Sequence, residues 1–217
     1  MRRRGVVLAL LAGCGAPPAT VGTPAGTPAP LPSPAAIADS GANGIVPAGY
    51  GTLKRDDIAV RLQPPDVLVS LIPLDESVIR ALASDSYRYL HDILESRRPE
   101  LTRIAARFGQ RRGSVWYAEF TGLAPDARYI PTDVTITSGG RDFRPLQILP
   151  LSTGFGSQRL QPREKQYAVY VFDDAVDVGQ SLTVTMASER NTEWDAILRN
   201  MLDRERAQIR ARAARKP

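Results

Sequence analysis

Two residue types that carry much of enzyme chemistry occur once each in this chain of 217 residues, as Cys14 and His91. A serine hydrolase of the triad type needs a histidine as its general base, and His91 is the only one available. His91 falls among apolar residues with helical spacing, and the chain holds no G-x-S-x-G motif, which marks a nucleophilic serine at a strand–helix turn. We interpret His91 as a histidine packed by its ring, and predict that the protein is not an enzyme and needs no cofactor.

Carboxylates offer a second kind of chemistry, because paired acids can transfer protons or hold a metal ion. Asp173, Asp174 and Asp177 lie together in the segment FDDAVDVG. This segment lacks the D-x-D-x-D-G spacing and the glutamate of a calcium loop, and zinc would need cysteine or histidine pairs that the chain does not contain. We expect a solvated turn after a strand and no metal site. A hydrolase whose carboxylates converge only in the fold stays as an alternative.

A segment that mixes glycines with cations, GFGSQRLQPREKQ at residues 154–166, offers a candidate binding loop between two predicted strands. Binding contacts concentrate on loops that a rigid scaffold positions. An exposed phenylalanine among cations would form the lip of a partner-binding site, and these residues are Phe155, Arg159, Arg163 and Lys165. The alternative is a mobile connector. The glycines of TSGGRDF, at residues 137–143, predict a hairpin turn and no phosphate loop, because no helix follows them.

Positive charge concentrates at the C-terminus. The segment 199–217 carries seven basic and two acidic residues, so that the rest of the chain after Cys14 has a net charge of −3. Five cations of this segment could attract anionic lipid headgroups or an acidic partner, namely Arg206, Arg210, Arg212, Arg215 and Lys216. The alternative is a solvated helix end whose cations oppose the negative end of the helix dipole.

The elements that must position these residues alternate between strand and helix patterns. Apolar residues with a period of two, or in continuous runs, predict about seven strands, at 57–62, 66–74, 114–122, 132–138, 142–149, 166–173 and 181–187. The run 166–173 is apolar on both faces and predicts a central strand. Helical spacing predicts short helices within 75–109, where Asp75 caps one start and Pro99 takes the first position of another.

This order of elements predicts a mainly β fold with inserted helices. We expect an immunoglobulin-like β-sandwich over 49–190, with a helical insertion at 75–109, followed by an amphipathic basic helix at 191–217. Apolar positions become rare after Leu202, so the last turns of that helix are expected to project or fray. The analogy concerns architecture and implies no function.

The N-terminus explains the single cysteine. Three arginines at positions 2–4 precede a short apolar run, Val6–Leu11, which has the order of a secretory signal peptide and is shorter than the roughly 20 residues that span a bilayer. The signal-cleavage motif that ends it consists of Leu11, Ala12, Gly13 and Cys14. This motif resembles the lipobox of bacterial lipoproteins, which are cut before the cysteine and lipidated on it. The resemblance implies a signal peptide at 1–13 and a lipid anchor on Cys14.

A proline-, alanine- and glycine-rich segment, residues 14–48, follows the cleavage site. It contains eight prolines and no aromatic residue, a composition that predicts a disordered tether. Together with the lipobox, it predicts a protein of the bacterial cell envelope, anchored to a membrane by lipid and facing the periplasm or the exterior. We expect a non-catalytic binding or structural role, with an envelope protein as partner and no nucleic acid. An envelope hydrolase and a factor in cell-wall or envelope assembly and maintenance are the alternatives.

Overall fold

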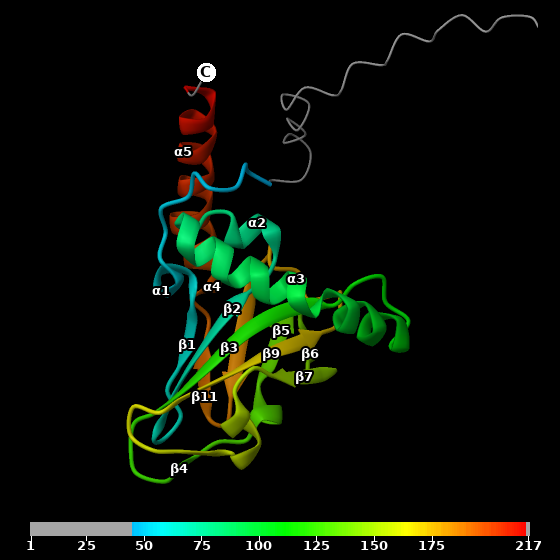
Figure 1. Ribbon diagram of the computed structural model, residues 1–217, viewed down its shortest axis with the longest axis vertical. Coiled ribbons are helices and arrows are strands. Elements are labelled where there is room, and N and C mark those ends of the chain that lie inside the picture. Colours follow the sequence, from blue (N-terminus) through cyan, green and yellow to red (C-terminus); the bar gives the residue numbers. More distant parts are fainter. Residues whose placement is uncertain (1–44, 216–217) are drawn as a thin grey trace, which may run out of the picture. The chain divides into compact units, whose positions relative to one another are not determined.

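The computed structural model describes residues 45–215 (Figure 1). The predictions for the signal peptide, for Cys14, for most of the tether and for Lys216 fall outside these residues. The described part is mainly β, with antiparallel strand pairing in both of its main sheets, and it ends in a helix. The predicted mainly β fold with a C-terminal helix is confirmed.

The larger sheet has five strands in the order β1-β2-β3-β9-β7. Their bounds are β1 (Val60–Leu62), β2 (Val67–Pro73), β3 (Ser114–Gly122), β9 (Lys165–Phe172) and β7 (Gln147–Pro150). The strand β9 pairs with β3 on one side and with β7 on the other, and it is buried along most of its length. The central position that its continuous apolar run predicts is therefore confirmed.

The smaller sheet has four strands in the order β11-β10-β5-β6. Their bounds are β11 (Glu189–Asn191), β10 (Leu182–Met186), β5 (Thr135–Ser138) and β6 (Arg141–Phe143). Gly139 and Gly140 have φ angles of 56° and 75° and form the two-residue turn that the sequence predicts between β5 and β6. A separate pair joins β4 (Ala127–Arg128) to β8 (Arg159–Leu160), and two short 3₁₀ helices, η2 (Pro131–Asp133) and η3 (Thr153–Ser157), complete the connections.

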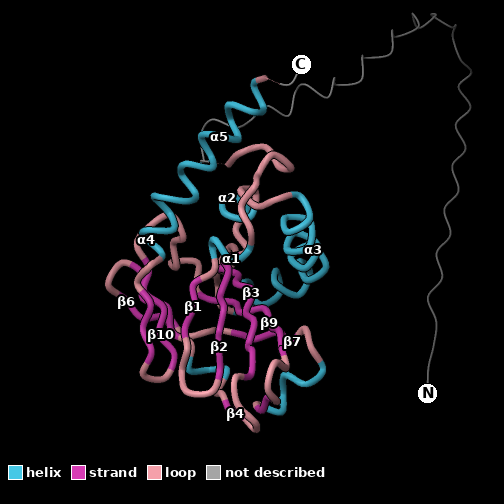
Figure 2. Tube along the Cα trace, turned by 90° about the vertical axis from the view of Figure 1, so that its left-hand side faces the viewer, coloured by secondary structure: helices cyan, strands magenta, loops and turns pink. Residues whose placement is uncertain are grey.

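A single hydrophobic core joins the two sheets and the C-terminal helix. Figure 2 shows the strands of both sheets beside one another, with α2 and α3 at one end. Trp116 of β3 is fully buried, and its ring centroid lies 6.1 Å from that of Trp194 in the C-terminal helix. The hydroxyl of Tyr170, on β9, donates to the carbonyl of Pro131 at 2.9 Å, so the polar end of this buried ring has a partner.

Two helices connect β2 to β3: α2 (Glu76–Ile79) and the long α3 (Ser84–Arg107). Pro99 lies inside α3, so the prediction that it begins a new helix is wrong. A proline removes one intrahelical hydrogen bond, but neighbouring bonds span the gap. Arg98 pairs with Glu95, and the hydroxyl of Thr102 donates to the carbonyl of Arg98 at 2.9 Å.

Two of the predicted strands have different bounds. Residues 55–58 form a short helix, α1 (Arg55–Ile58), which leaves only 60–62 for the first strand. The run 142–149 divides at Pro145, because a proline cannot donate a ladder hydrogen bond, and its halves become edge strands of different sheets. The immunoglobulin-like arrangement is not confirmed, since β2 and β3 are neighbours in one sheet, whereas the second and third strands of an immunoglobulin domain lie in opposite sheets.

The C-terminal helix consists of α4 (Trp194–Ala196), a π-helical stretch η4 (Ile197–Leu202) and α5 (Asp203–Ala214). Beyond Leu202, Glu205 and Ile209 are buried against the domain. The helix α5 extends away from the sheets (Figure 1), as expected, but it does not fray before Ala214, because polar bonds to the first described residues hold it in place. None of the helices in residues 45–215 combines the length and apolar character that crossing a bilayer requires.

Candidate functional site

A groove of about 980 Å³ lies between the helices α2 and α3 and the loop 174–180, which links β9 to β10. Apolar side chains from all sides line it: Leu74, Leu94, Leu101, Ala105, Val115, Val176 and Val178. Most of these are only partly buried, so the groove presents apolar surface to solvent. Its volume lies at the upper end of the range for ligand pockets.

Charged side chains of both signs line the groove. Asp75 and Glu76, at the start of α2, line one part of it. Arg98 on α3 and the consecutive residues Arg111 and Arg112, in the turn between α3 and β3, line another part, and Asp174 joins these two arginines in an adjoining hollow of about 440 Å³. Asp177 of the loop 174–180 also lines the groove, so four carboxylates and three guanidinium groups face a ligand there.

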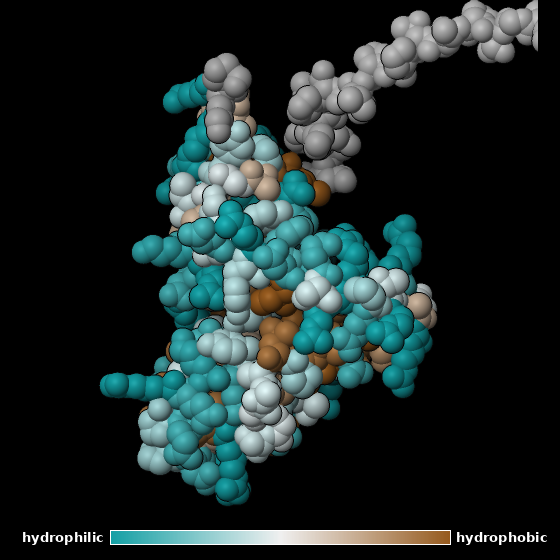
Figure 3. All heavy atoms as spheres, in the orientation of Figure 1, coloured by the Kyte–Doolittle hydropathy of each residue, from teal (hydrophilic) through white to brown (hydrophobic). Residues whose placement is uncertain are grey.

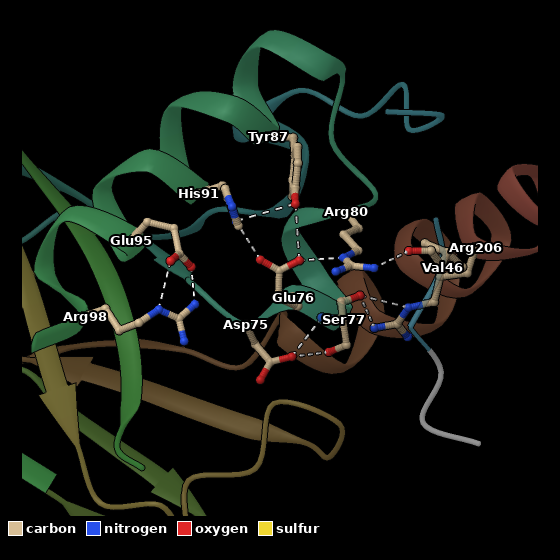
Figure 4. Close-up of polar contacts among 10 residues, drawn as sticks. All are labelled: Val46, Asp75, Glu76, Ser77, Arg80, Tyr87, His91, Glu95, Arg98 and Arg206. Atoms are coloured by element: carbon tan, nitrogen blue, oxygen red, sulfur yellow. Dashed lines mark hydrogen bonds and ion pairs between the residues drawn. The ribbon is translucent and has the colours of Figure 1, made fainter. Parts of the chain in front are cut away.

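Glu76 gathers three side chains around its carboxylate (Figure 4). Its Oε2 accepts a hydrogen bond from Nε of Arg80 at 2.5 Å, and its Oε1 lies 2.9 Å from Nδ1 of His91. The hydroxyl of Tyr87 lies 3.4 Å from Oε2 of Glu76, while its ring stacks on the imidazole with a centroid distance of 5.2 Å. Burial, and secondarily the charge of Glu76, raise the pKa of the Tyr87 hydroxyl above its ordinary value.

His91 lies on α3 beside Tyr87, as its helical spacing predicts, and its side chain is 33% exposed. Its bond to Glu76 was not predicted, because the two residues belong to different helices. A carboxylate that orients an imidazole is also part of a catalytic triad. Within residues 45–215, however, the ring bonds only to Glu76 and Tyr87, and no serine or threonine hydroxyl is within hydrogen-bond reach of it.

Asp75 performs the capping role that the sequence predicts. Its Oδ1 accepts from the backbone N–H of Ser77 at 2.9 Å and from the hydroxyl of Ser77 at 2.6 Å. The carbonyl of Ser77 in turn accepts two bonds from the guanidinium of Arg206 on α5, at 3.2 and 2.9 Å. The helix α2, and with it the carboxylate part of the groove, is thus fixed by the C-terminal helix (Figure 4).

The predicted binding loop does not form an exposed aromatic lip. Phe155 is only 4% exposed, and its ring packs against those of Phe120 and Tyr129 at centroid distances of 5.7 and 5.9 Å. The prediction of an exposed phenylalanine is therefore wrong: Phe155 lies in the 3₁₀ helix η3, and its ring packs into the aromatic core.

The three cations of that loop are exposed but do not converge. Arg159 pairs with Asp126 at 3.4 Å, and Lys165 pairs with Glu119 at 2.6 Å across the neighbouring strand. Arg163 lies in a turn with a φ angle of 66°. None of them lines the groove.

The five cations predicted at the C-terminus divide into two groups in the described part of the chain. Arg206 and Arg212 bond within the protein, Arg206 to Ser77 and Arg212 to the carbonyl of Tyr50 at 2.7 Å. Arg210 and Arg215 are exposed, and Lys216 is outside the described residues. The side chain of Arg206 is 13% exposed and that of Arg212 is 37% exposed, and contact of these cations with an anionic surface stays a prediction.

The aspartates after β9 cap turns, as their position after a strand predicts. Oδ1 of Asp173 accepts from the backbone N–H of Ala175 at 2.9 Å, and Oδ1 of Asp177 accepts from that of Gly179 at 2.8 Å. Asp174 is exposed beside the arginines of the groove. Within residues 45–215, no three side chains of the His, Cys, Asp and Glu types are grouped so that they could hold a metal ion.

Sequence reasoning missed the arginines of the groove. The signal was present: the segment 97–112 contains six arginines and one glutamate. The net charge of the chain between Cys14 and residue 199 is negative, and this sum does not reveal the local excess of arginines. Comparisons with protein-family models, with curated proteins and with solved structures found no match to this chain.

Proposed function

We propose that this protein is a lipid-anchored lipoprotein of the bacterial cell envelope with a non-catalytic binding role, and that the groove between α2, α3 and the loop 174–180 is its binding site. The proposed envelope location rests on the resemblance of the first 14 residues to a lipoprotein signal peptide with its lipobox. The partner we propose is an envelope protein, with the lipid on Cys14 as the contact to the membrane.

The observation that carries the binding role is the groove itself, which is open, partly apolar and about 980 Å³ in volume. An apolar surface flanked by oriented polar groups is typical of recognition sites. Its carboxylates at the α2 side already accept hydrogen bonds from the protein: Asp75 from Ser77, and Glu76 from Arg80. These hydrogen bonds fix the orientation of the two carboxylates toward a ligand.

One experiment tests the proposed envelope location, and another tests the proposed binding groove. The mass of the N-terminal peptide from membranes of the native host should correspond to a chain that begins at a lipidated Cys14. A photo-crosslinking residue at Thr102, which lines the groove, should capture an envelope protein in living cells, while the same residue at Ser96, exposed elsewhere on α3, should not. An intact Met1 would refute the proposed lipid anchor and envelope location. Equal crosslinking from both positions would refute the groove as the binding site.

The pairing of His91 with Glu76 favours one alternative, an envelope hydrolase in which Glu76 orients His91 as a base. The full-length protein would then hydrolyse an activated ester such as p-nitrophenyl acetate, and His91→Ala would abolish the reaction. We expect no turnover above that of the His91→Ala variant. A rate that depends on His91 would replace the binding role with catalysis.

A further inference from the structure

The arginines of the helix α5 differ in whether they have an acidic partner. Residues 203–215 contain five arginines and two acids. Asp203 pairs with Arg206 at 2.8 Å, and Glu205 pairs with Arg212 at 2.8 Å. Both acids are therefore used by arginines that also bond to backbone carbonyls of the domain. The other three arginines of this helix are left without an acidic partner on it.

These three arginines, Arg204, Arg210 and Arg215, are exposed. In the described part of the chain, none of their guanidinium groups forms an ion pair or a hydrogen bond. At 3.6 residues per turn, the three lie within an arc of about 140° around the helix axis, and the buried Glu205 and Ile209 lie outside that arc. The outward face of α5 therefore carries positive charge that the protein does not neutralise.

The rest of the outward face consists of small residues. Ala207, Ala211 and Ala214 lie within the same arc and are exposed. Their short side chains let a flat surface approach the helix closely, while the long arginine side chains reach out to charged groups beside it. Figure 3 shows hydrophilic side chains along α5. Protein interfaces are built around large apolar and aromatic side chains, which this face lacks, so it fits a charged bilayer surface better than a protein partner.

The helix dipole explains only part of this charge. A cation is favourable at the C-terminal end of a helix, but the effect falls off within the last turn. Arg215 caps that end. Arg204 lies about three turns before it, and the residues that precede Arg204 continue the helix as η4. The dipole therefore gives a role to Arg215 alone among the three exposed arginines.

The position of α5 brings its outward face to the end of the domain at which the anchored chain enters. Arg212 and Glu205 of α5 bond to Tyr50 and Thr52, and these first described residues and α5 lie together at the end opposite β4 (Figures 1 and 2). The described part begins at residue 45, which is 31 positions after Cys14. A chain of this length spans at most about 100 Å, so a lipid on Cys14 would keep α5 within reach of the bilayer.

We propose that the outward face of α5, with Arg204, Arg210 and Arg215, binds anionic phospholipid headgroups of the membrane to which the protein is anchored. This inference rests on the proposed lipid anchor and adds a second membrane contact, which orients the domain. A guanidinium pairs with a phosphate through two parallel hydrogen bonds. Each cation near an anionic bilayer strengthens the attachment by about fivefold.

The test uses the lipidated full-length protein, extracted in detergent and reconstituted into vesicles. Cys14 is the only cysteine of the chain, so a thiol-reactive fluorophore labels only α5 in the variant Ala211→Cys when Cys14 carries lipid. Vesicles of one part phosphatidylglycerol to two parts phosphatidylcholine, with a nitroxide on a fraction of the headgroups, should quench this fluorophore at least about threefold more than vesicles of phosphatidylcholine alone. High salt should remove the difference.

Two triple variants in the Ala211→Cys background separate the face of α5 from general charge. Arg204→Gln/Arg210→Gln/Arg215→Gln should weaken the contact by about 100-fold, so that quenching falls to the level seen with phosphatidylcholine. The matched control removes as many charges from three exposed arginines that lie outside α5 and have no ion pair in the described part, and it should change quenching by less than about twofold. This control is Arg144→Gln/Arg163→Gln/Arg190→Gln. Circular dichroism should show that both variants are folded.

Equal quenching in the two kinds of vesicle, or an equal loss in the two triple variants, would overturn the proposal. A photo-crosslinking residue at position 211 that captures an acidic envelope protein, with no quenching by phosphatidylglycerol vesicles, would identify a protein partner instead. Labelling of the parent chain tests the anchor separately. A parent that takes up the fluorophore has a free Cys14, and the anchor and the proposal then both fail; an unlabelled parent without quenching refutes only the role of α5.

Discussion

Oε1 of Glu205, on the C-terminal helix α5, accepts hydrogen bonds from the backbone N–H of Thr52 at 2.9 Å and from its hydroxyl at 3.0 Å. Arg212, two turns further along α5, donates to the same oxygen at 2.8 Å. Glu205 is 4% exposed, so its charge is buried but paired. The beginning and the end of the described chain are thus held together by one carboxylate.

Removing this carboxylate should destabilise the domain. Glu205→Ala leaves the N–H of Thr52 without its acceptor, and we expect the free energy of unfolding to fall by about 2 kcal/mol. Urea unfolding followed by tryptophan fluorescence measures it. Glu189→Ala, at an exposed position, is the control and should change stability by less than about 0.5 kcal/mol. Equal stability of the two variants would show that the Glu205 bonds contribute nothing.

Two arginines of α5 that look equivalent in the sequence, Arg206 and Arg210, should differ in their contribution to stability. Arg206→Ala removes both bonds to the carbonyl of Ser77 and should lower the free energy of unfolding by about 1–2 kcal/mol, whereas Arg210→Ala should have almost no effect. Thermal unfolding of the two variants at equal concentration makes the comparison. A larger effect at Arg210 would contradict the structural role given to Arg206.

Stability should decrease in alkaline solution because of buried tyrosines. Burial raises the pKa of the Tyr129 hydroxyl to about 12, and it also raises the pKa values of Tyr117 and Tyr170. A phenol whose pKa is higher in the folded state contributes stability that is complete below pH 10 and is lost as pH rises through the folded pKa, here between 10 and about 12 for Tyr129.

We expect unfolding free energy to fall by about 1.4 kcal/mol per pH unit for each such tyrosine in this window. Urea unfolding at several pH values between 8 and 12, with tyrosinate absorbance near 295 nm as a second signal, measures the slope. Tyr129→Phe removes one titrating group and should make the slope shallower. A stability that is constant up to pH 12 would contradict the burial of these hydroxyls.

Gly51 should not accept a side chain. A Cβ placed there would lie 2.3 Å from the carbonyl oxygen of Ala81 and 2.5 Å from that of Leu82, and backbone atoms cannot move aside cheaply. Gly51→Ala should lower the free energy of unfolding by about 1–3 kcal/mol through overpacking. Gly156→Ala is the control, because nothing lies within 4 Å of its Cβ position and its φ is not positive. Similar melting temperatures for the two variants would refute the close approach.

The strands were largely predictable because burial on one face imposes a period of two. In β10, Leu182, Val184 and Met186 are buried and the threonines between them are not, which is the pattern that the sequence shows. The bounds and pairings of the edge strands were less predictable. Pro145 signals an interruption, but not that the chain crosses from one sheet to the other there, because that depends on pairings with residues far away in the sequence.

The groove could be predicted only in part, because helices from one segment and a loop from another form it. Asp75 was identified as a cap from local spacing, and local hydrogen bonds decide that role. The pairing of Glu76 with His91 joins two helices whose packing follows from the tertiary core, which no local pattern encodes. Phe155 was misjudged for the same reason: whether a loop phenylalanine turns inwards depends on the rings of Phe120 and Tyr129.

The segment 51–53 lies in parallel bridges against residues 82 and 83, and Leu53 both donates to the carbonyl of Ala81 and accepts from the N–H of Ala83. A force applied to the chain before residue 51 acts first on these bonds. A lipid anchor on Cys14 would apply its force at this place, before it reached the sheets. Glu205 bonds to Thr52 within this segment, so pulling on residue 45 with optical tweezers should give a lower rupture force when Glu205 is replaced by alanine.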